Sequence, residues 1–431
     1  MGAAIRARVT CPHCWHRFAC EEILWISQHP DLLGDARLGS DYQRRFLPTR
    51  FTAEGAAIDA RGFECLGLAC PNCHLGVPRA FLEMRSLLLS VLGTPACGKS
   101  YFLASMVWQL RQTLPRDFSL SFADADPELN RIVTEYEELQ FLNPDQERLV
   151  ALRKTDVQGD LYDSVLFAGE AVRFPRPFVF TVSPLATHPS AAKADELAQV
   201  LCLYDNAGES FLPGADQASA PVTRHLAQSR ALFFLFDPTQ DIRFRRACAG
   251  QTDDPQMQAR TARLDRETAV RQDTVLLEAI ARIRKHRGLS SSERYEQPLV
   301  IVVTKHDAWA SLLGHDKLPS VWARGKTSDL CLLDLEHIEG VSANLRALLW
   351  RLTPEVVSAA EGFAQHVIYI PISALGCPPE VDADTGALGI RPKDIAPQWV
   401  ETPLLYVLAK ETKGLIARRK EVAAGVVEER E

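Results

Sequence analysis

Six short runs of consecutive apolar residues recur between positions 86 and 372. None alternates apolar with polar positions, so each predicts a strand buried on both faces, as in a parallel sheet. The runs are Ser86 to Leu92, Pro177 to Val182, Gln199 to Asp205, Ala231 to Phe236, Pro298 to Val303 and Val367 to Ile372. Apolar residues at helical spacing follow Ser100 and Pro403. The pattern predicts an α/β fold with a mostly parallel, doubly wound sheet.

Several connections between these runs are long enough to hold helical insertions, which we expect at about 124–150, 239–296 and 309–364. Apolar positions in the second insertion predict an amphipathic helix, which either packs on the flank of the domain or forms a partner surface. These positions are Val275, Leu276, Leu277, Ile280 and Ile283. The predicted organisation is a small module at 1–82, an α/β domain at 86–410 and a charged C-terminal tail at 411–431.

Composition and charge narrow the class of protein. The chain has 431 residues, a formal net charge of −7 and 11 cysteines. The negative charge argues against broad binding to nucleic acid, which needs clustered Lys and Arg. No apolar run approaches the ~18 residues of a membrane span, and the first residues lack the apolar core of a signal peptide. We therefore expect a cytoplasmic protein with reduced cysteines.

A glycine-rich turn joins the first apolar run to the helix that follows it. It has the form G-x-x-x-x-G-K-S, in which backbone N–H groups and a helix N-terminus surround phosphate oxygens. Lys99 would reach the β- and γ-phosphates, and the Ser100 hydroxyl would bind Mg²⁺. The candidate phosphate-binding residues are Gly93, Thr94, Pro95, Ala96, Cys97, Gly98, Lys99, Ser100 and Tyr101.

A second segment, Asp205 to Gly208, follows the third apolar run. Open α/β sheets bind their ligands at the carboxyl ends of strands, so this position places a carboxylate where a phosphate-bound metal would lie. Asp205 can hold Mg²⁺, and the Gly208 N–H can meet the γ-phosphate. An Asp-x-x-Gly sequence on its own is a common turn, and only its place after a strand gives it weight.

Two further segments predict a site for a purine base. Thr304, Lys305 and Asp307 follow the fifth run, and the Asp307 carboxylate suits the two neighbouring donors of guanine, whereas adenine offers the wrong pattern. The Lys305 stem can lie across the purine plane. After the sixth run, backbone N–H groups could contact the guanine O6; these belong to Ser373, Ala374 and Leu375.

Two Cys-Pro-x-Cys pairs near the N-terminus predict a zinc-ribbon-like site. Four thiolates paired in this way suit tetrahedral Zn²⁺, and here they are Cys11, Cys14, Cys70 and Cys73. The gap between the pairs is longer than in the usual ribbon, so the module must contain an insertion. Alternative ligands are Cys20, Cys65, His13, His16 and His74. The module lacks a basic face, which favours a structural or protein-docking role over nucleic-acid binding.

Taken together in this order, the four nucleotide segments resemble the Ras-like, translation-factor-class (TRAFAC) P-loop GTPases over about residues 86 to 410. The resemblance implies a switch threonine that covers Mg²⁺, for which Thr155 is the candidate, and a catalytic role for Lys99 and for Glu209. This sequence departs from the family at two points. Thr304 stands where Asn is more common, and Glu209 stands where Ras-like enzymes carry Gln. A carboxylate beside an anionic γ-phosphate predicts slow hydrolysis.

The cysteine-rich N-terminus and the stretch from Arg391 to Leu405 are similar to bacterial conflict-system GTPases of the paired double-GTPase type. That resemblance implies a protein partner, either a second GTPase or an effector. The sequence therefore predicts a GTP-binding switch that uses GTP, GDP and Mg²⁺, with Zn²⁺ in the N-terminal module. Two alternatives remain open: a nucleotide-bound scaffold with vestigial hydrolysis, and an ATP-using P-loop NTPase.

Overall fold

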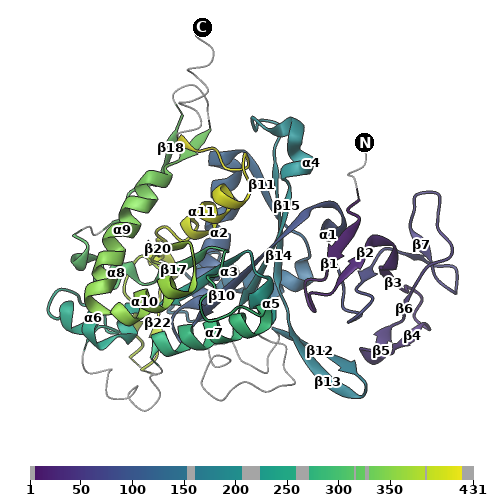
Figure 1. Cartoon of the computed structure of the whole chain (residues 1–431), viewed down its shortest axis with the longest axis horizontal. Coiled ribbons are helices and arrows are strands. Elements are labelled where there is room, and N and C mark those ends of the chain that lie inside the picture. The colour runs from purple at the N-terminus through teal and green to yellow at the C-terminus, as the bar shows by residue number, and fades with distance from the viewer. Residues whose placement is uncertain are drawn as a thin grey trace, which may run out of the picture.

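The computed structural model describes residues 5–152, 161–205, 224–258, 271–314, 317–325, 330–383 and 386–419. A seven-stranded sheet in the order β11-β14-β15-β10-β16-β17-β20 forms its centre (Figure 1). Its strands are β10 (Arg85–Gly93), β11 (Leu120–Asp124), β14 (Phe178–Pro184), β15 (Gln199–Asp205), β16 (Ala231–Phe236), β17 (Leu299–Val303) and β20 (Val367–Pro371). β14 pairs antiparallel with both neighbours, and the other pairs are parallel. The predicted α/β fold with a mostly parallel sheet is confirmed.

Three groups of elements cover the two faces of this sheet. On one face, alternate residues of β10, such as Leu87, Leu89 and Val91, pack against α2 (Lys99–Phe118) and α11 (Thr402–Glu411). On the other face, the strands from β16 onward pack against helices that come mainly from the predicted insertions. These are α5 (Arg224–Gln228), α6 (Ile242–Ala247), α7 (Gln272–Arg287), α9 (Leu335–Leu352) and α10 (Pro354–Phe363).

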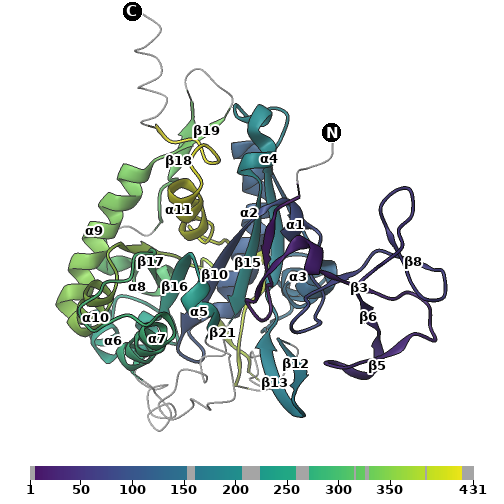
Figure 2. The same cartoon turned by 45° about the vertical axis from the view of Figure 1, so that its right-hand side comes forward.

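The N-terminal module covers the remaining part of that second face. Leu88 of β10, Val179 of β14 and Tyr204 of β15 share one core with residues of the module such as Trp15 and Phe18. The module thus fills a position that a helix would otherwise occupy, and it extends away from the sheet as small hairpins (Figures 1 and 2). Its strands are β1 (Arg8–Thr10), β2 (Arg17–Ala19), β3 (Leu24–Ile26), β4 (Leu33–Asp35), β5 (Gly39–Gln43), β6 (Arg45–Phe46), β7 (Ala57–Ile58), β8 (Glu64–Cys65) and β9 (Leu68–Ala69); the short helix α1 (Ala80–Glu83) leads into β10.

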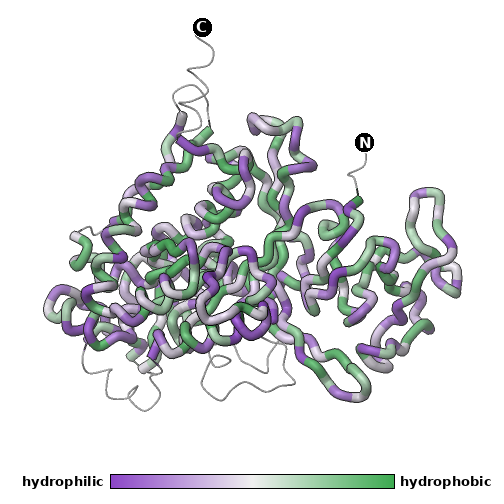
Figure 3. The backbone as a smooth tube through the Cα atoms, viewed as in Figure 1, coloured by the Kyte–Doolittle hydropathy of each residue, from purple (hydrophilic) through white to green (hydrophobic). Residues whose placement is uncertain are grey.

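The insertions contain strands as well as helices. The first holds α3 (Pro127–Phe141), and the third, which follows the short helix α8 (His306–Trp309), holds a hairpin of β18 (Trp322–Arg324) and β19 (Cys331–Leu333). A hairpin of β12 (Tyr162–Phe167) and β13 (Glu170–Pro175) projects beyond the sheet with a hydrophobic tip (Figures 1 and 3). It contacts the N-terminal module, because the Leu166 N–H donates to the Arg37 carbonyl at 2.8 Å.

Two details differ from the sequence analysis. Leu277 does not belong to the buried face of α7, since its side chain is 52% exposed, whereas the other four expected positions are buried. The chain beyond residue 411 does not form only a charged tail, because Leu415 and Ile416 are buried in the core under α11. In the part of the chain that the structure describes, no helix has the length and apolar character needed to cross a membrane.

Candidate functional site

Three of the predicted nucleotide segments line one cavity of about 420 Å³ at the carboxyl edge of the sheet. Each segment follows a different strand, namely β10, β17 or β20, and parallel strands bring their carboxyl ends to the same edge. The connections after β10 and β16 leave in opposite directions, which marks the kind of crevice where α/β sheets bind ligands. The predicted residues that line the cavity are Pro95, Ala96, Cys97, Gly98, Lys99, Ser100, Tyr101, Thr304, Lys305, Asp307, Ser373, Ala374 and Leu375.

The glycine-rich loop has a backbone that its two glycines permit. Gly93 has φ 156°, and a Cβ there would lie 2.7 Å from Cys97 Sγ and 2.9 Å from the Leu235 carbonyl oxygen. Gly98 has φ 92° and caps the N-terminus of α2. The loop therefore folds tightly over the start of a 20-residue helix, whose first N–H groups face the cavity end of the sheet.

Side chains fix this loop from two directions. Lys99 Nζ donates to the carbonyls of Gly93 at 3.1 Å and Thr94 at 2.8 Å, so the lysine lies along the loop. Thr94 Oγ1 donates to Gln240 Oε1 at 2.9 Å, and Gln240 Nε2 donates to the Pro95 carbonyl at 3.0 Å. Gln240 was not among the predicted site residues, and it holds the loop from the turn that follows β16.

Asp307 and Ser373 lie together at the other end of the cavity. Ser373 Oγ donates to Asp307 Oδ1 and accepts from the Gly376 N–H at 2.7 Å. Burial raises the pKa of Asp307, while the Ser373 hydrogen bond and the charge of Lys305 act against that change. The segment after β20 is tied to α2, because Ser105 Oγ donates to the Ala374 carbonyl at 2.8 Å. The two predicted base-binding segments therefore form one unit.

Lys305 has three side-chain partners that the sequence did not reveal. Its Nζ donates to Asp237 Oδ2 at 2.6 Å, Gln256 Oε1 at 2.7 Å and Thr239 Oγ1 at 3.1 Å. Asp237 is fully buried at the end of β16. A carboxylate directly after an apolar strand was visible in the sequence and could have suggested it, whereas Gln256 carried no local signal.

Apolar side chains form part of the cavity wall. Tyr101 OH accepts from the Leu152 N–H at 2.9 Å, and Val150 pairs with Ile390 in an isolated antiparallel bridge. The short strands β21 (Glu380–Val381) and β22 (Leu388–Gly389) continue this wall. The apolar lining residues from it are Leu152, Pro379, Leu388 and Ile390. Such a wall suits a flat, mostly apolar group held by a few polar contacts.

The remaining predicted nucleotide residues lie elsewhere. Asp205 is buried at the carboxyl end of β15, level with Val91 of β10, and it does not line the cavity. Gly93 is the last residue of β10 and Thr94 is buried beside it, and neither lines the cavity. Thr155, Gly208 and Glu209 fall outside the described residues.

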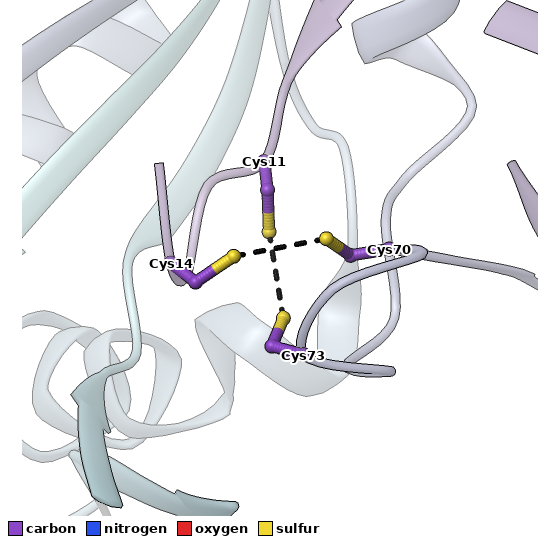
Figure 4. Close-up of side chains that lie close together, drawn as sticks. All are labelled: Cys11, Cys14, Cys70 and Cys73. Atoms are coloured by element: carbon purple, nitrogen blue, oxygen red, sulfur yellow. Dashed lines mark hydrogen bonds between the residues drawn. The ribbon is translucent and has the colours of Figure 1, made fainter. Parts of the chain in front are cut away.

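The four predicted cysteine ligands come together in the N-terminal module (Figure 4). Their Sγ atoms all lie within 4.8 Å of one another, with Cys11 to Cys73 and Cys14 to Cys70 both at 3.7 Å. Four sulfurs about 2.3 Å from a tetrahedral Zn²⁺ would be about 3.8 Å apart, so the observed spacing fits a zinc ion. A cluster of four cysteines that could bind a metal is therefore present.

The two Cys-Pro-x-Cys turns have the same backbone geometry. In the first, the His13 N–H donates to Cys11 Sγ at 3.3 Å, and in the second the Asn72 N–H donates to Cys70 Sγ at 3.4 Å. The residue after each second cysteine has a positive φ, 57° at Trp15 and 62° at His74. N–H donors aimed at sulfur stabilise thiolates, which are the form that binds metal.

The alternative ligands are not part of this cluster. His13 Nε2 contacts the Gly76 carbonyl at 3.0 Å, and His74 Nδ1 contacts Asp35 Oδ2 at 2.9 Å. Cys65 Sγ donates to the Phe63 carbonyl at 3.6 Å. Among the described residues, the four paired cysteines form the one group of three or more His, Cys, Asp or Glu side chains close enough to share an ion. Cys20 and His16 are outside it.

No protein-family model matches the chain. Part of the chain is similar to a protein of Mycolicibacterium smegmatis named "Putative ESX-1 scaffolding and assembly protein SaeC". The two are 26% identical over 172 residues, which make up 39% of this chain and 37% of the relative. The chain thus spans little more than a third of the curated relative that it matches, and the similarity relates parts of two proteins.

Proposed function

We propose that the chain is a Ras-like P-loop GTPase that binds GTP and GDP with Mg²⁺ and switches its affinity for a protein partner. The observation that carries the proposal is the single cavity lined by the glycine-rich loop, Lys305 with Asp307, and Ser373 to Leu375. These segments are about 200 and 70 residues apart in the chain, yet they face one space. A phosphate-binding end and a purine-binding end are the two halves that a nucleotide needs.

Each residue has a chemical role in this proposal. Lys99 and the N-terminus of α2 would bind the phosphates, and the oxygens of Ser100 and Asp205 would hold Mg²⁺. Asp307 would accept from the guanine N1–H and amine, and the apolar wall would cover the base. Thr155 would complete the metal site, and Glu209 would stand beside the γ-phosphate, where its charge would keep hydrolysis slow.

The test is a binding titration of GTP, ATP and xanthosine triphosphate against wild type, Lys99→Ala and Asp307→Asn. Asp307→Asn should lower the affinity for GTP, since each buried donor left unpaired costs about 1 to 3 kcal/mol. The same variant should gain affinity for xanthosine triphosphate. Lys99→Ala should weaken the binding of every nucleotide alike, because in this proposal Lys99 would contact the phosphates and not the base. A wild type that prefers ATP, or an Asp307→Asn protein with unchanged GTP affinity, would contradict the guanine assignment in favour of an ATP-using NTPase.

A nucleotide-bound scaffold is the second candidate function. The observation that favours it is the partial similarity to the Mycolicibacterium smegmatis protein, whose name describes a putative scaffolding and assembly protein. In the switch, a partner binds the GTP form and the GDP form with different affinity, whereas in the scaffold it binds both alike. Pull-downs with a slowly hydrolysed GTP analogue and with GDP, followed by single-turnover hydrolysis with the captured partner, separate the two.

The N-terminal cysteine cluster enters the proposal as a structural Zn²⁺ site. All four ligand positions are cysteines, which is the composition of closed structural sites rather than of catalytic ones. When bound, the ion would cross-link the two Cys-Pro-x-Cys turns across more than fifty residues of sequence. Cys11, Cys14, Cys70 and Cys73 would then fix the module on the sheet.

A further inference from the structure

A tight turn in the second insertion brings Gln256 to the cavity at the carboxyl edge of the sheet. Asp254 Oδ1 accepts from the Gln256 N–H at 2.7 Å, and the Asp254 carbonyl accepts from the Met257 N–H at 3.0 Å. Met257 is 5% exposed and belongs to the core beneath α7. The turn is therefore anchored on both sides of Gln256, whose side chain is one of the residues that line the cavity.

The Gln256 oxygen completes the set of acceptors around the Lys305 ammonium. An ammonium has three N–H donors, and here they have three acceptors: Asp237 Oδ2, Thr239 Oγ1 and Gln256 Oε1. Two of these belong to the turn directly after β16. Gln256 is the one that comes from the insertion, and it approaches Lys305 from within the cavity lining.

We propose that Gln256 is a positioning residue that fixes the Lys305 side chain along the cavity wall. With its ammonium held by three acceptors, the lysine stem has a defined path, and that path forms the surface on which a flat ring would lie. The role in nucleotide binding rests on the proposed function. The hydrogen bond by which Gln256 holds Lys305, here called the clamp, does not rest on it, because it is a contact within the protein itself.

Chemical acetylation of the folded protein tests the clamp directly. The probe is an N-hydroxysuccinimide ester of acetic acid, and mass spectrometry follows Lys305 alongside Lys317, which is exposed. Gln256→Met removes the oxygen at similar volume and should raise the acetylation rate of Lys305 roughly tenfold, as expected for losing a hydrogen bond to a charged group. Gln256→Glu keeps an oxygen and should leave Lys305 slow.

Gln258→Met is the matched control, because it changes the same residue type on the exposed side of the same segment. It should leave the rate at Lys305 near the wild-type value, and no variant should change the rate at Lys317. A Gln256→Met protein in which Lys305 reacts at the wild-type rate overturns the proposal. So does an equal rise at Lys305 and Lys317, which would indicate general loosening of the fold.

A double-mutant cycle with GDP then tests the consequence for binding. In the wild-type background, Gln256→Met should lower the affinity for GDP roughly tenfold. In the Lys305→Met background it should have little further effect on that affinity, because the Gln256 amide acts through the lysine. An equal loss in both backgrounds overturns the positioning role. If wild type binds no guanine nucleotide, the proposed function fails, while the acetylation rates still decide whether Gln256 holds Lys305.

Discussion

Trp15 anchors the N-terminal module to the central sheet, and its removal should be the most destabilising single change at that contact. Its indole packs against Phe174, Tyr204 and His225 with ring centroids 5.7 to 6.3 Å apart. Its Nε1 donates to Tyr204 OH at 3.1 Å, and that hydroxyl donates in turn to the Pro12 carbonyl. The side chain is thus both packed and hydrogen-bonded across the boundary between module and sheet.

The expected loss can be worked out from this environment. A buried indole removes roughly 200 Å² from water, which at about 25 cal/mol per Å² corresponds to about 5 kcal/mol. Measured losses for Trp→Ala in cores are about 3 to 5 kcal/mol, so we expect Trp15→Ala to lower the free energy of unfolding by about 4 kcal/mol. Tyr204→Phe keeps the ring but unpairs the Trp15 N–H and the Pro12 carbonyl, and should cost about 1 to 3 kcal/mol.

The assay is urea unfolding followed by far-ultraviolet circular dichroism at a fixed free-zinc concentration. Trp350→Ala is the control, because that tryptophan is 51% exposed on α9 and its loss should change stability by no more than about 0.5 kcal/mol. If Trp15→Ala costs no more stability than Trp350→Ala, the contact between the module and the sheet does not depend on Trp15.

Three further predictions concern the metal, the loop and a buried acid. Purified protein should contain about one zinc per chain by elemental analysis, Cys70→Ser should lose it and Cys20→Ser should keep it, since Cys20 lies outside the cluster. Gly93→Ala should abolish nucleotide binding or lower the melting temperature, because its Cβ would meet Cys97 Sγ at 2.7 Å. Burial raises the pKa of Glu401 from 4.5 to about 7. The neutral acid is favoured by folding, so unfolding free energy should fall by about 3 kcal/mol between pH 4.5 and 7, and Glu401→Gln should flatten this dependence in pH-dependent urea titrations.

Most strands of the central sheet could be predicted because a strand that is buried on both faces is a run of consecutive apolar residues. Ala231–Phe236 and Gln199–Asp205 are strands with the bounds that the apolar runs suggest. The strand β11 (Leu120–Asp124) is harder to predict, because it is an edge strand with alternating burial and follows α2 after a single residue. The sequence did not predict the β12–β13 hairpin either, since neither of its strands is a run of apolar residues and its contacts with the N-terminal module join segments that are distant in sequence.

The candidate sites divide in the same way. The glycine-rich loop and the cysteine pairs are contiguous motifs, so a few adjacent residues are enough to predict the chemistry of each. Gln256 and Gln240 act through partners that are distant in sequence, and no local pattern distinguishes them from other glutamines. Asp237 lies between these cases, since its position after β16 was visible but its pairing with Lys305 at 2.6 Å depends on the fold.

The N-terminal module shares a core with the α/β domain, so a metal bound in the module could influence the proposed nucleotide site. The hydroxyl of Tyr204 binds the backbone of the first cysteine turn, and the next residue is Asp205, the candidate Mg²⁺ ligand. A zinc ion that fixes Cys11 and Cys14 would therefore also fix the end of β15. Without it, Trp15 and Tyr204 would lose a defined partner, and the carboxylate would lose its support. The module and the cavity are thus expected to respond together to metal removal, although they lie on different elements.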